Sequence, residues 1–348
     1  MPVLRAQDPD AVGQAAQALA EGELLAFPTE TVYGLGARAD DDAAVAKIFE
    51  AKGRPADHPL IVHVTDAAAA QAFAAIWPPA AQVLAQHFWP GPMTLIVPRR
   101  PGVATAAAGG HASIGLRCPD HPVALDLLAR AQALGVRGVA GPSANRFGRV
   151  SPTTAAHVVA EFGPELAVLD GGACREGIES TIVDCTRARP ALLRPGTTPR
   201  TVIEEVLRQA LSLPLVDRDE ASPKASGTLA SHYAPDALVS LLSAEELTQR
   251  LATFNANRAQ GDARSQTQTQ TQARAGAGVG VYSRTALPCP PGVFHRTMPA
   301  HPAQAAHELF AVLRELDAHA VRQIWVEAPP EGPEWDGVRD RLQRAATR

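Results

Sequence analysis

Cysteine is scarce in this 348-residue sequence, and its four cysteines lie far apart without a CxxC pair: Cys118, Cys174, Cys185 and Cys289. This spacing argues against a zinc ribbon or a disulfide framework and fits a reducing compartment. Long apolar runs are also missing, because no stretch approaches the roughly 18 residues of a membrane span and the N-terminus lacks an apolar signal segment. We therefore expect a cytoplasmic protein without membrane contact.

An excess of positive charge is missing as well. Lys and Arg total 32 against 36 for Asp and Glu, the net charge is −4, and aromatic residues make up only 5%. Tight non-specific nucleic-acid binding is therefore not expected as the main role. The sequence contains no GxxxxGK(S/T) loop, no HExxH and no GxSxG motif, and its 11 histidines show no metal-ligand spacing.

What is present is an apolar content of 46% in a chain longer than one hydrophobic core usually supports, so we expect two domains. Short apolar runs alternate with helical patterns over the first 210 residues, which predicts an α/β fold. The candidate strands there are residues 24–27, 60–64, 93–97, 113–117, 136–140, 167–169, 181–184 and 191–193.

The periodic pattern of apolar residues is lost between Ser212 and Pro235, which predicts a linker or lid over residues 212–235. This segment would join a catalytic domain (1–211) to a smaller α/β domain (236–348). The smaller domain has predicted strands at 237–242, 279–282 and 323–327 and predicted helices at 244–254, 303–316 and 335–345. A run of alternating Gln and Thr over residues 266–272 predicts a disordered insertion at about 256–278.

Polar side chains follow several of the predicted strands. Thr29, Glu30 and Thr31 come directly after the first strand, and Gly34 and Gly36 then allow a sharp bend. These three side chains would face a cavity, although an ordinary turn in which the hydroxyls cap the backbone explains the segment equally well.

Two cations, Lys52 and Arg54, close a predicted helix that begins after Asp41. The lysine ammonium and the several N–H donors of the arginine guanidinium would together suit a polyphosphate. Cations at a helix C-terminus also complement the helix macrodipole, however. Arg117 ends a strand, where it would either hold a carboxylate or protect a sheet edge. Ser143 and Asn145 occupy a turn rich in small residues, which lets a ligand approach closely.

Ser180 begins one strand and Arg194 ends another. Three cations and at least four hydroxyl or amide groups therefore fall at strand ends, a combination that predicts a polar ligand cavity.

These motifs together resemble the threonylcarbamoyl-AMP synthase family in its two-domain form, and residues 232–235 (His-Tyr-Ala-Pro) match its linker signature; the motifs are residues 28–36, 51–55, 142–145, 179–181 and 193–196. The resemblance implies a YrdC-like catalytic domain with a twisted mixed sheet and a large cavity, followed by a smaller Rossmann-like α/β domain.

The resemblance also implies an activity. Members of this family are nucleotidyltransferases that form threonylcarbamoyl-AMP and pyrophosphate from L-threonine, bicarbonate or CO₂, and ATP. The product then passes to a separate tRNA-modifying complex that makes threonylcarbamoyladenosine. Mg²⁺ would accompany the ATP phosphates without protein ligands, and no organic cofactor is implied.

Residue roles follow from the same resemblance. The L-threonine site would contain Thr29, His63, Arg117 and Ser180, with Arg117 on the carboxylate. The ATP site would contain Lys52, Arg54, Ser113, Ser143, Asn145, Ser151, Arg194 and Tyr233, with Tyr233 closing from the linker. No covalent nucleophile is implied, and Lys52, Arg54 and Arg194 would stabilise charge.

Two alternatives remain at this point. One is a carbamoyltransferase use of the same domain, as in hydrogenase maturation proteins, but those carry Cys-rich zinc modules that four scattered cysteines do not supply. The other is an RNA-binding or ribosome-assembly module, which the acidic net charge and the few aromatics oppose while leaving weak RNA contact open.

Overall fold

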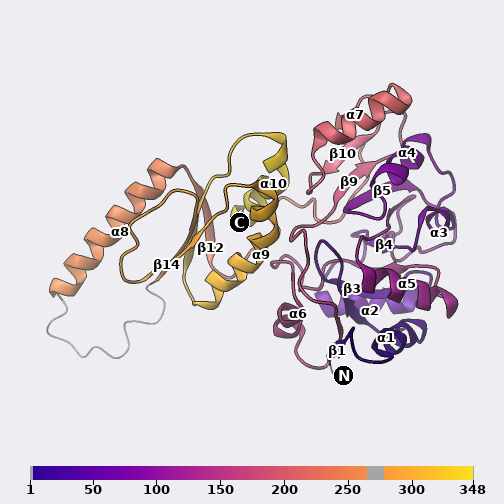
Figure 1. The fold of residues 1–348 in the computed structure, drawn as a ribbon, viewed down its shortest axis with the longest axis horizontal. Helices are drawn as coiled ribbons and strands as arrows, with labels where there is room; N and C mark the ends of the chain where they lie inside the picture. Colours follow the sequence, from indigo (N-terminus) through magenta and orange to yellow (C-terminus); the bar gives the residue numbers. More distant parts are fainter. Residues whose placement is uncertain (1–2, 265–277, 348) are drawn as a thin grey trace. The chain divides into compact units, whose positions relative to one another are not determined.

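The computed structural model describes residues 3–264 and 278–347. These residues form two compact units: residues 1–147 with 151–228, and residues 148–150 with 229–348 (Figure 1). The predicted linker therefore divides between the two units. Its first part is held by hydrogen bonds from Arg194 to Ser226, and its second part by a hydrogen bond from Arg344 to Leu229.

The first unit contains one mixed eleven-stranded sheet in the order β1-β8-β2-β3-β7-β4-β6-β5-β9-β10-β11. Five of its strand pairs are parallel and five are antiparallel, which confirms the predicted mixed sheet. The strands are β1 Val3–Arg5, β2 Leu25–Phe27, β3 Gly34–Arg38, β4 Ile61–His63, β5 Met93–Pro98, β6 Ser113–Arg117, β7 Val139–Ala140, β8 Ala167–Asp170, β9 Thr181–Asp184, β10 Ala191–Arg194 and β11 Val216–Asp217.

Both faces of this sheet are buried, because successive side chains of β2 belong to two different apolar clusters. Leu25 and Phe27 belong to one apolar cluster, built with helices α1 and α5, whereas Ala26 belongs to a second cluster that includes residues of α2, α4 and α7. Neighbouring side chains of a strand point to opposite faces, so the two clusters lie on opposite sides. The helices are α1 Ala11–Ala20, α2 Asp42–Lys52, α3 Ala67–Gln71, α4 Pro79–Phe88, α5 Pro122–Ala133, α6 Ala155–Phe162 and α7 Arg200–Leu211.

The glycines after the first strand do not form the bend that the sequence predicts. Gly34 and Gly36 lie inside β3, which runs antiparallel to β2, and the bend lies before them. A Cβ atom at either glycine would approach Cε1 of Phe27 to 3.0 Å. These positions therefore favour glycine because the Phe27 ring packs directly against the backbone.

The second unit contains a four-stranded sheet in the order β12-β15-β13-β14, and all three strand pairs are parallel. This arrangement confirms a smaller α/β domain. Its elements are β12 Leu238–Leu242, α8 Ala244–Arg264, β13 Val279–Ser283, β14 Val293–Thr297, α9 Pro302–Ala318, β15 Gln323–Glu327, a 3₁₀ turn at Pro333–Trp335 and α10 Asp336–Ala346.

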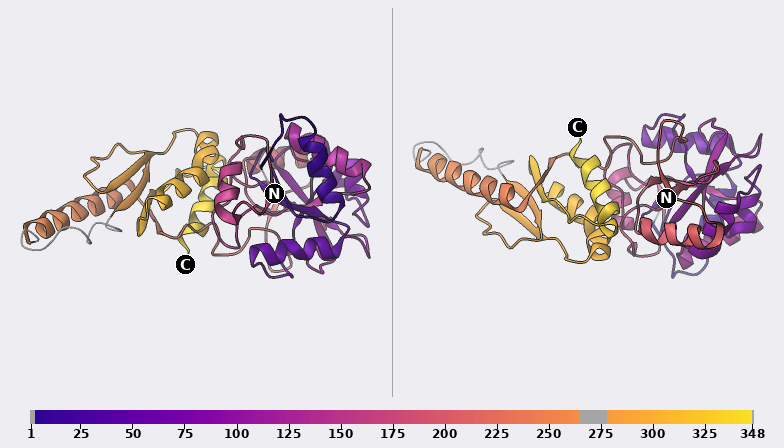
Figure 2. Two further views of the ribbon diagram at one scale, coloured as in Figure 1. Left: turned by 90° about the horizontal axis from the view of Figure 1, so that it is seen from below. Right: turned by 90° about the horizontal axis from the view of Figure 1, so that it is seen from above.

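Helix α8 corrects one prediction. Ser243 and Glu246 form the reciprocal cap at its start, with N···O distances of 2.8 and 3.1 Å. The helix continues to Arg264 and extends beyond the sheet of its unit (Figure 2), so residues 256–264 are helical where a disordered insertion was predicted. Ala, Arg and Gln favour helix propagation there. The rest of that prediction, residues 265–277, lies outside the described residues.

Candidate functional site

The turn after β2 is fixed by Thr29. Its hydroxyl donates to the carbonyl of Val32 (2.6 Å) and accepts from the backbone N–H groups of Thr31 and Val32 (both 3.2 Å). The Thr29 and Thr31 hydroxyl oxygens are also 2.9 Å apart. This turn directs the intervening Glu30 side chain inward, where it is 1% exposed.

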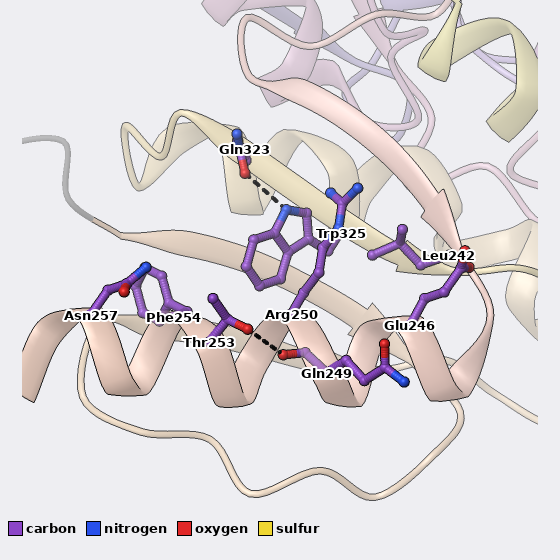
Figure 3. Close-up of a pocket in the computed structure, with 9 residues that line it drawn as sticks. All are labelled: Leu242, Glu246, Gln249, Arg250, Thr253, Phe254, Asn257, Gln323 and Trp325. Atoms are coloured by element: carbon purple, nitrogen blue, oxygen red, sulfur yellow. Dashed lines mark hydrogen bonds between the residues drawn. The ribbon is translucent and has the colours of Figure 1, made fainter.

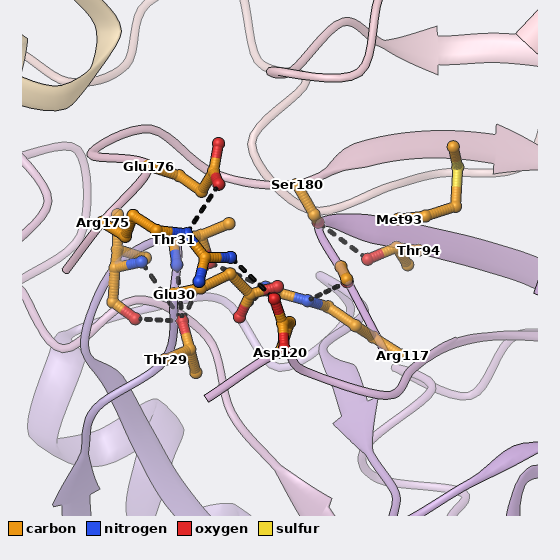
Figure 4. A network of polar contacts seen from close by, with 12 residues as sticks. Thr29, Glu30, Thr31, Met93, Thr94, Arg117, Asp120, Arg175, Glu176 and Ser180 are labelled. Atoms are coloured by element: carbon orange, nitrogen blue, oxygen red, sulfur yellow. Dashed lines mark hydrogen bonds and ion pairs between the residues drawn. The ribbon is translucent and has the colours of Figure 1, made fainter. Parts of the chain in front are cut away.

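Arg117, at the end of β6, reaches the same turn (Figure 4). Its Nη1 donates to Thr31 Oγ1 (2.8 Å), its Nε donates to the carbonyl of Gly91 (3.3 Å), and its Nη2 lies 2.6 Å from Glu30 Oε2. The guanidinium is only 4% exposed. Three contacts from two separate parts of the chain therefore orient one buried cation before any ligand arrives.

His63 lies beside this cation. It ends β4 and is the register partner of Arg117 on β6, and its ring contacts Phe27 edge to face at 5.4 Å. Burial, reinforced by the Arg117 charge and opposed by a hydrogen bond from the ring to the Val139 backbone, lowers the pKa of His63 to about 3. The imidazole is therefore neutral at physiological pH.

Lys52 joins two of the predicted nucleotide residues. It is the last residue of α2, and its Nζ donates to the carbonyl oxygens of Ser143 (2.6 Å) and Asn145. Desolvation, with the nearby Arg54 charge, lowers the pKa of Lys52 well below its usual value, against the opposing effect of Glu161 and Glu179. The predicted proximity of Lys52, Ser143 and Asn145 is therefore present, but the lysine contacts the backbone of the turn.

Arg54 and Ser151 are buried in the same unit. Arg54 Nη2 donates to the carbonyl of Pro59 (3.0 Å), and the guanidinium carbon lies 5.8 Å from the centroid of the Phe147 ring. The Ser151 hydroxyl donates to Glu179 Oε1 (2.5 Å). Both side chains are thus held by partners of the first domain.

Ser180 links the two groups of predicted residues. Its hydroxyl oxygen lies 2.8 Å from that of Thr94, and its carbonyl accepts from Arg194 Nε (3.0 Å) and Nη2 (2.9 Å). Arg194 Nη2 also donates to the Ser180 hydroxyl (3.2 Å), and Nη1 donates to the carbonyl of Ser226 (2.9 Å). A residue expected beside threonine therefore contacts a residue expected beside phosphate.

Ser113 and Tyr233 complete the predicted nucleotide set. Ser113 begins β6 and lines a small pocket with Thr94, Lys224 and Ser226. Tyr233, in the second unit, is 1% exposed, stacks on Phe310 at 5.4 Å and lies 5.4 Å from the Arg341 guanidinium. Their roles at ATP stay predictions.

Sequence reasoning left Glu30 and Thr94 without a role. Glu30 stands between two threonines of a polar motif, which was the available signal, but its partner Arg117 is remote in the sequence. Thr94 lies in an apolar strand, where a single hydroxyl does not indicate a binding site. Its contact with Ser180 is visible only in the fold, where β5 pairs with β9.

The second domain has a groove of about 490 Å³ between α8 and the sheet (Figure 3). The Trp325 ring lies 6.1 Å from Phe254 and 5.9 Å from the Arg250 guanidinium, and its indole N–H donates to Gln323 (2.9 Å). Neither the motifs nor the family resemblance assigned a residue there.

Within residues 3–264 and 278–347, no three His, Cys, Asp or Glu side chains come together as metal ligands. Among the helices of these residues, none combines the length and apolarity needed to cross a bilayer.

Comparison with known proteins gives two family matches. The family described as telomere recombination matches residues 17–196, and the threonylcarbamoyl-AMP synthase C-terminal domain matches residues 199–347. The threonylcarbamoyl-AMP synthase of Pyrococcus abyssi is 46% identical over 227 residues, which are 65% of this chain and 66% of that protein. The Schizosaccharomyces pombe enzyme of the same name is 31% identical over 355 residues, covering 93% of this chain and 85% of that protein.

Solved structures extend the match to the whole chain. The structure of Pyrococcus abyssi Sua5 complexed with L-threonine has a TM-score of 0.83 and 34% identity, covering 99% of this chain and 97% of the other. Both domains and their order are therefore shared. On this evidence, the chain belongs to the threonylcarbamoyl-AMP synthase family, in its two-domain form.

Proposed function

We propose that this protein is a nucleotidyltransferase that forms threonylcarbamoyl-AMP and pyrophosphate from L-threonine, bicarbonate or CO₂, and ATP. The observation that carries the proposal is the contact between Ser180 and Arg194, at 3.2 Å. An amino-acid carbamate can attack the α-phosphate only if its site adjoins the nucleotide site. This contact supports such an adjacency.

The threonine half is proposed to use Arg117 for the carboxylate, with Thr29, His63 and Ser180 around the rest of the molecule. A neutral His63 supports this arrangement, because it adds hydrogen-bonding capacity without a second positive charge. The relative that was solved with L-threonine supports the choice of amino acid.

The nucleotide half is proposed to use Lys52, Arg54 and Arg194 on the phosphates; Ser113, Ser143, Asn145, Ser151 and Tyr233 complete the proposed set. All three cations are at least nine-tenths buried, so their charges act in a low effective dielectric. Mg²⁺ is proposed to enter with ATP, because phosphate oxygens are its preferred hard ligands.

In the proposed reaction, the threonine nitrogen forms a carbamate, and a carbamate oxygen then attacks the α-phosphorus as pyrophosphate leaves. No protein nucleophile is needed, so catalysis rests on positioning and on stabilising the phosphate charge. The product is proposed to pass to a separate tRNA-modifying transferase complex in the cytoplasm, and weak RNA binding by this chain is proposed beside it.

The test incubates the full chain with ATP, Mg²⁺ and bicarbonate, with and without L-threonine, and identifies the nucleotide product by mass spectrometry. We expect threonylcarbamoyl-AMP and pyrophosphate only when threonine is present. ADP as the product, or AMP formed equally well without threonine, would refute the proposed function.

A further inference from the structure

Glu30 is a buried carboxylate without an aligned hydrogen-bond donor. Its side chain is 1% exposed, and within the described residues neither Oε1 nor Oε2 accepts a hydrogen bond. Oε2 lies 2.6 Å from Arg117 Nη2, but the two groups do not have the alignment of a hydrogen bond. Burying a carboxylate in this state is unfavourable, so the site favours a ligand that brings a donor to Glu30.

Arg117 keeps donors for a ligand of its own. A guanidinium has five N–H groups, and two of them are used by Gly91 and Thr31. The pair of Glu30 and Arg117 carries no net charge. The Glu30 carboxylate, which accepts no hydrogen bond, lies beside the unused N–H groups of Arg117 (Figure 4). A zwitterionic α-amino acid has the complementary groups, a carboxylate for Arg117 and an ammonium for Glu30.

We propose that Glu30 binds the ammonium group of the substrate amino acid and accepts the proton that this group must lose before its nitrogen can react. The inference rests on the proposed function and adds a catalytic residue to it. Within the site, Glu30 and Arg117 would thus hold the two charged ends of one molecule.

The proton balance of the step is simple. The ammonium transfers one proton to the Glu30 carboxylate, which leaves a neutral amine and a neutral carboxyl group. The amine nitrogen then forms a bond to the carbon of bicarbonate while a carbon–oxygen bond breaks. Hydroxide leaves with the second nitrogen proton as water, a carbamate anion remains, and Glu30 returns its proton to solvent.

Several titratable groups interact electrostatically with Glu30. Besides Arg117, these are His121, Cys118 and Cys174. Burial lowers the pKa of His121, and burial raises the pKa of both thiols to about 12. At neutral pH, the imidazole and the thiols are therefore uncharged beside the carboxylate.

The binding test compares L-threonine with (2S,3R)-2,3-dihydroxybutanoate, in which a hydroxyl replaces the ammonium, by isothermal titration calorimetry. Loss of one charge-assisted contact predicts that Glu30→Gln binds L-threonine about 10- to 100-fold more weakly. Affinity for the dihydroxy analogue should be unchanged. Equal weakening for both ligands would overturn the proposal, because Glu30 would then act only by positioning Arg117.

The matched control is Glu176→Gln, which removes a carboxylate that contacts Arg175 (3.3 Å) in the neighbouring network. It should bind both ligands like the unaltered protein. Glu30→Asp keeps the charge, so it should retain preference for the ammonium ligand even if Glu30→Gln folds poorly. Loss of that preference in Glu30→Asp, at an unchanged unfolding temperature, would also count against Glu30.

The proton-transfer step has its own readout, the rate of pyrophosphate release. Electron-withdrawing fluorine makes the ammonium of 4,4,4-trifluorothreonine more acidic, so the rate defect of Glu30→Gln should be smaller with this analogue. An equal defect with both amino acids would refute the role as a base. If the unaltered protein releases no threonine-dependent pyrophosphate, the proposed function fails; if it does and Glu30→Gln matches it, only this inference fails.

Discussion

His63 should make the stability of the first domain depend on pH, because its ring is buried and neutral between β4 and β6. Replacing it by Gln keeps a polar side chain that does not titrate. The pKa of His63 is 6.5 in an unperturbed setting and about 3 in the fold, chiefly because burial disfavours the charged ring. The difference between these pKa values sets the size of the effect.

The sign follows from proton binding. Below about pH 6.5 the unfolded chain protonates this ring, whereas the folded chain does so only near pH 3. Unfolding therefore takes up a proton between these values, and the stability contributed by neutral His63 is lost as the pH falls. At pH 5 the loss is about 2 kcal/mol relative to pH 7.5, and any folded pKa of about 4 or lower gives nearly the same figure.

Urea denaturation of the protein and of His63→Gln at pH 7.5 and pH 5.0 measures this effect. The free energy of unfolding should fall by about 2 kcal/mol more in the unaltered protein than in the variant. Other histidines, such as His58 and His121, contribute equally to both proteins and cancel in the comparison. An identical loss in both proteins would show that His63 can be charged in the folded state.

Three further predictions concern the nucleotide half and the insertion. Arg194→Ala should slow threonine-dependent pyrophosphate release about 100-fold, equivalent to about 3 kcal/mol, and an unchanged rate would remove its assigned role. Because Lys52 is one of the three proposed phosphate cations, Lys52→Gln should weaken ATP binding measured by calorimetry, whereas Lys52→Arg, which keeps the charge, should retain it. Deleting residues 266–272 should leave the rate unchanged, and a collapse in rate would show that the tract is structural.

The parts of the fold that the sequence predicted are those with a local signal. All eight candidate strands of the first domain are present because each is a short apolar run with polar ends. The cap of α8 also has a local pattern, Ser243 with Glu246 three positions later. By contrast, β1 is a largely exposed Val-Leu-Arg segment and β3 contains two glycines, so neither shows a strand pattern.

The contacts of the site could not be predicted because they join distant residues. Lys52 and Ser143 are separated by 91 positions, and Arg117 and Thr31 by 86. Strand-end positions indicated which side chains would gather, but sheet order decides which of them touch. Thus the sequence indicated Lys52 as a phosphate cation, whereas its bonds to backbone carbonyls appear only in the fold.

The way each cation is held distinguishes the two halves of the proposed site. Lys52 donates to the carbonyls of Ser143 and Asn145, and Arg194 to those of Ser180 and Ser226, and such neutral acceptors orient a cation without cancelling its charge. Arg117 instead lies against the buried carboxylate of Glu30, which cancels its charge. Cations held by backbone carbonyls suit a polyphosphate, and a neutral pair suits a zwitterion. Neutralising Glu30 should therefore weaken the binding of L-threonine and leave that of simple carboxylates unchanged, which an affinity series from acetate to L-threonine would detect as a loss of discrimination.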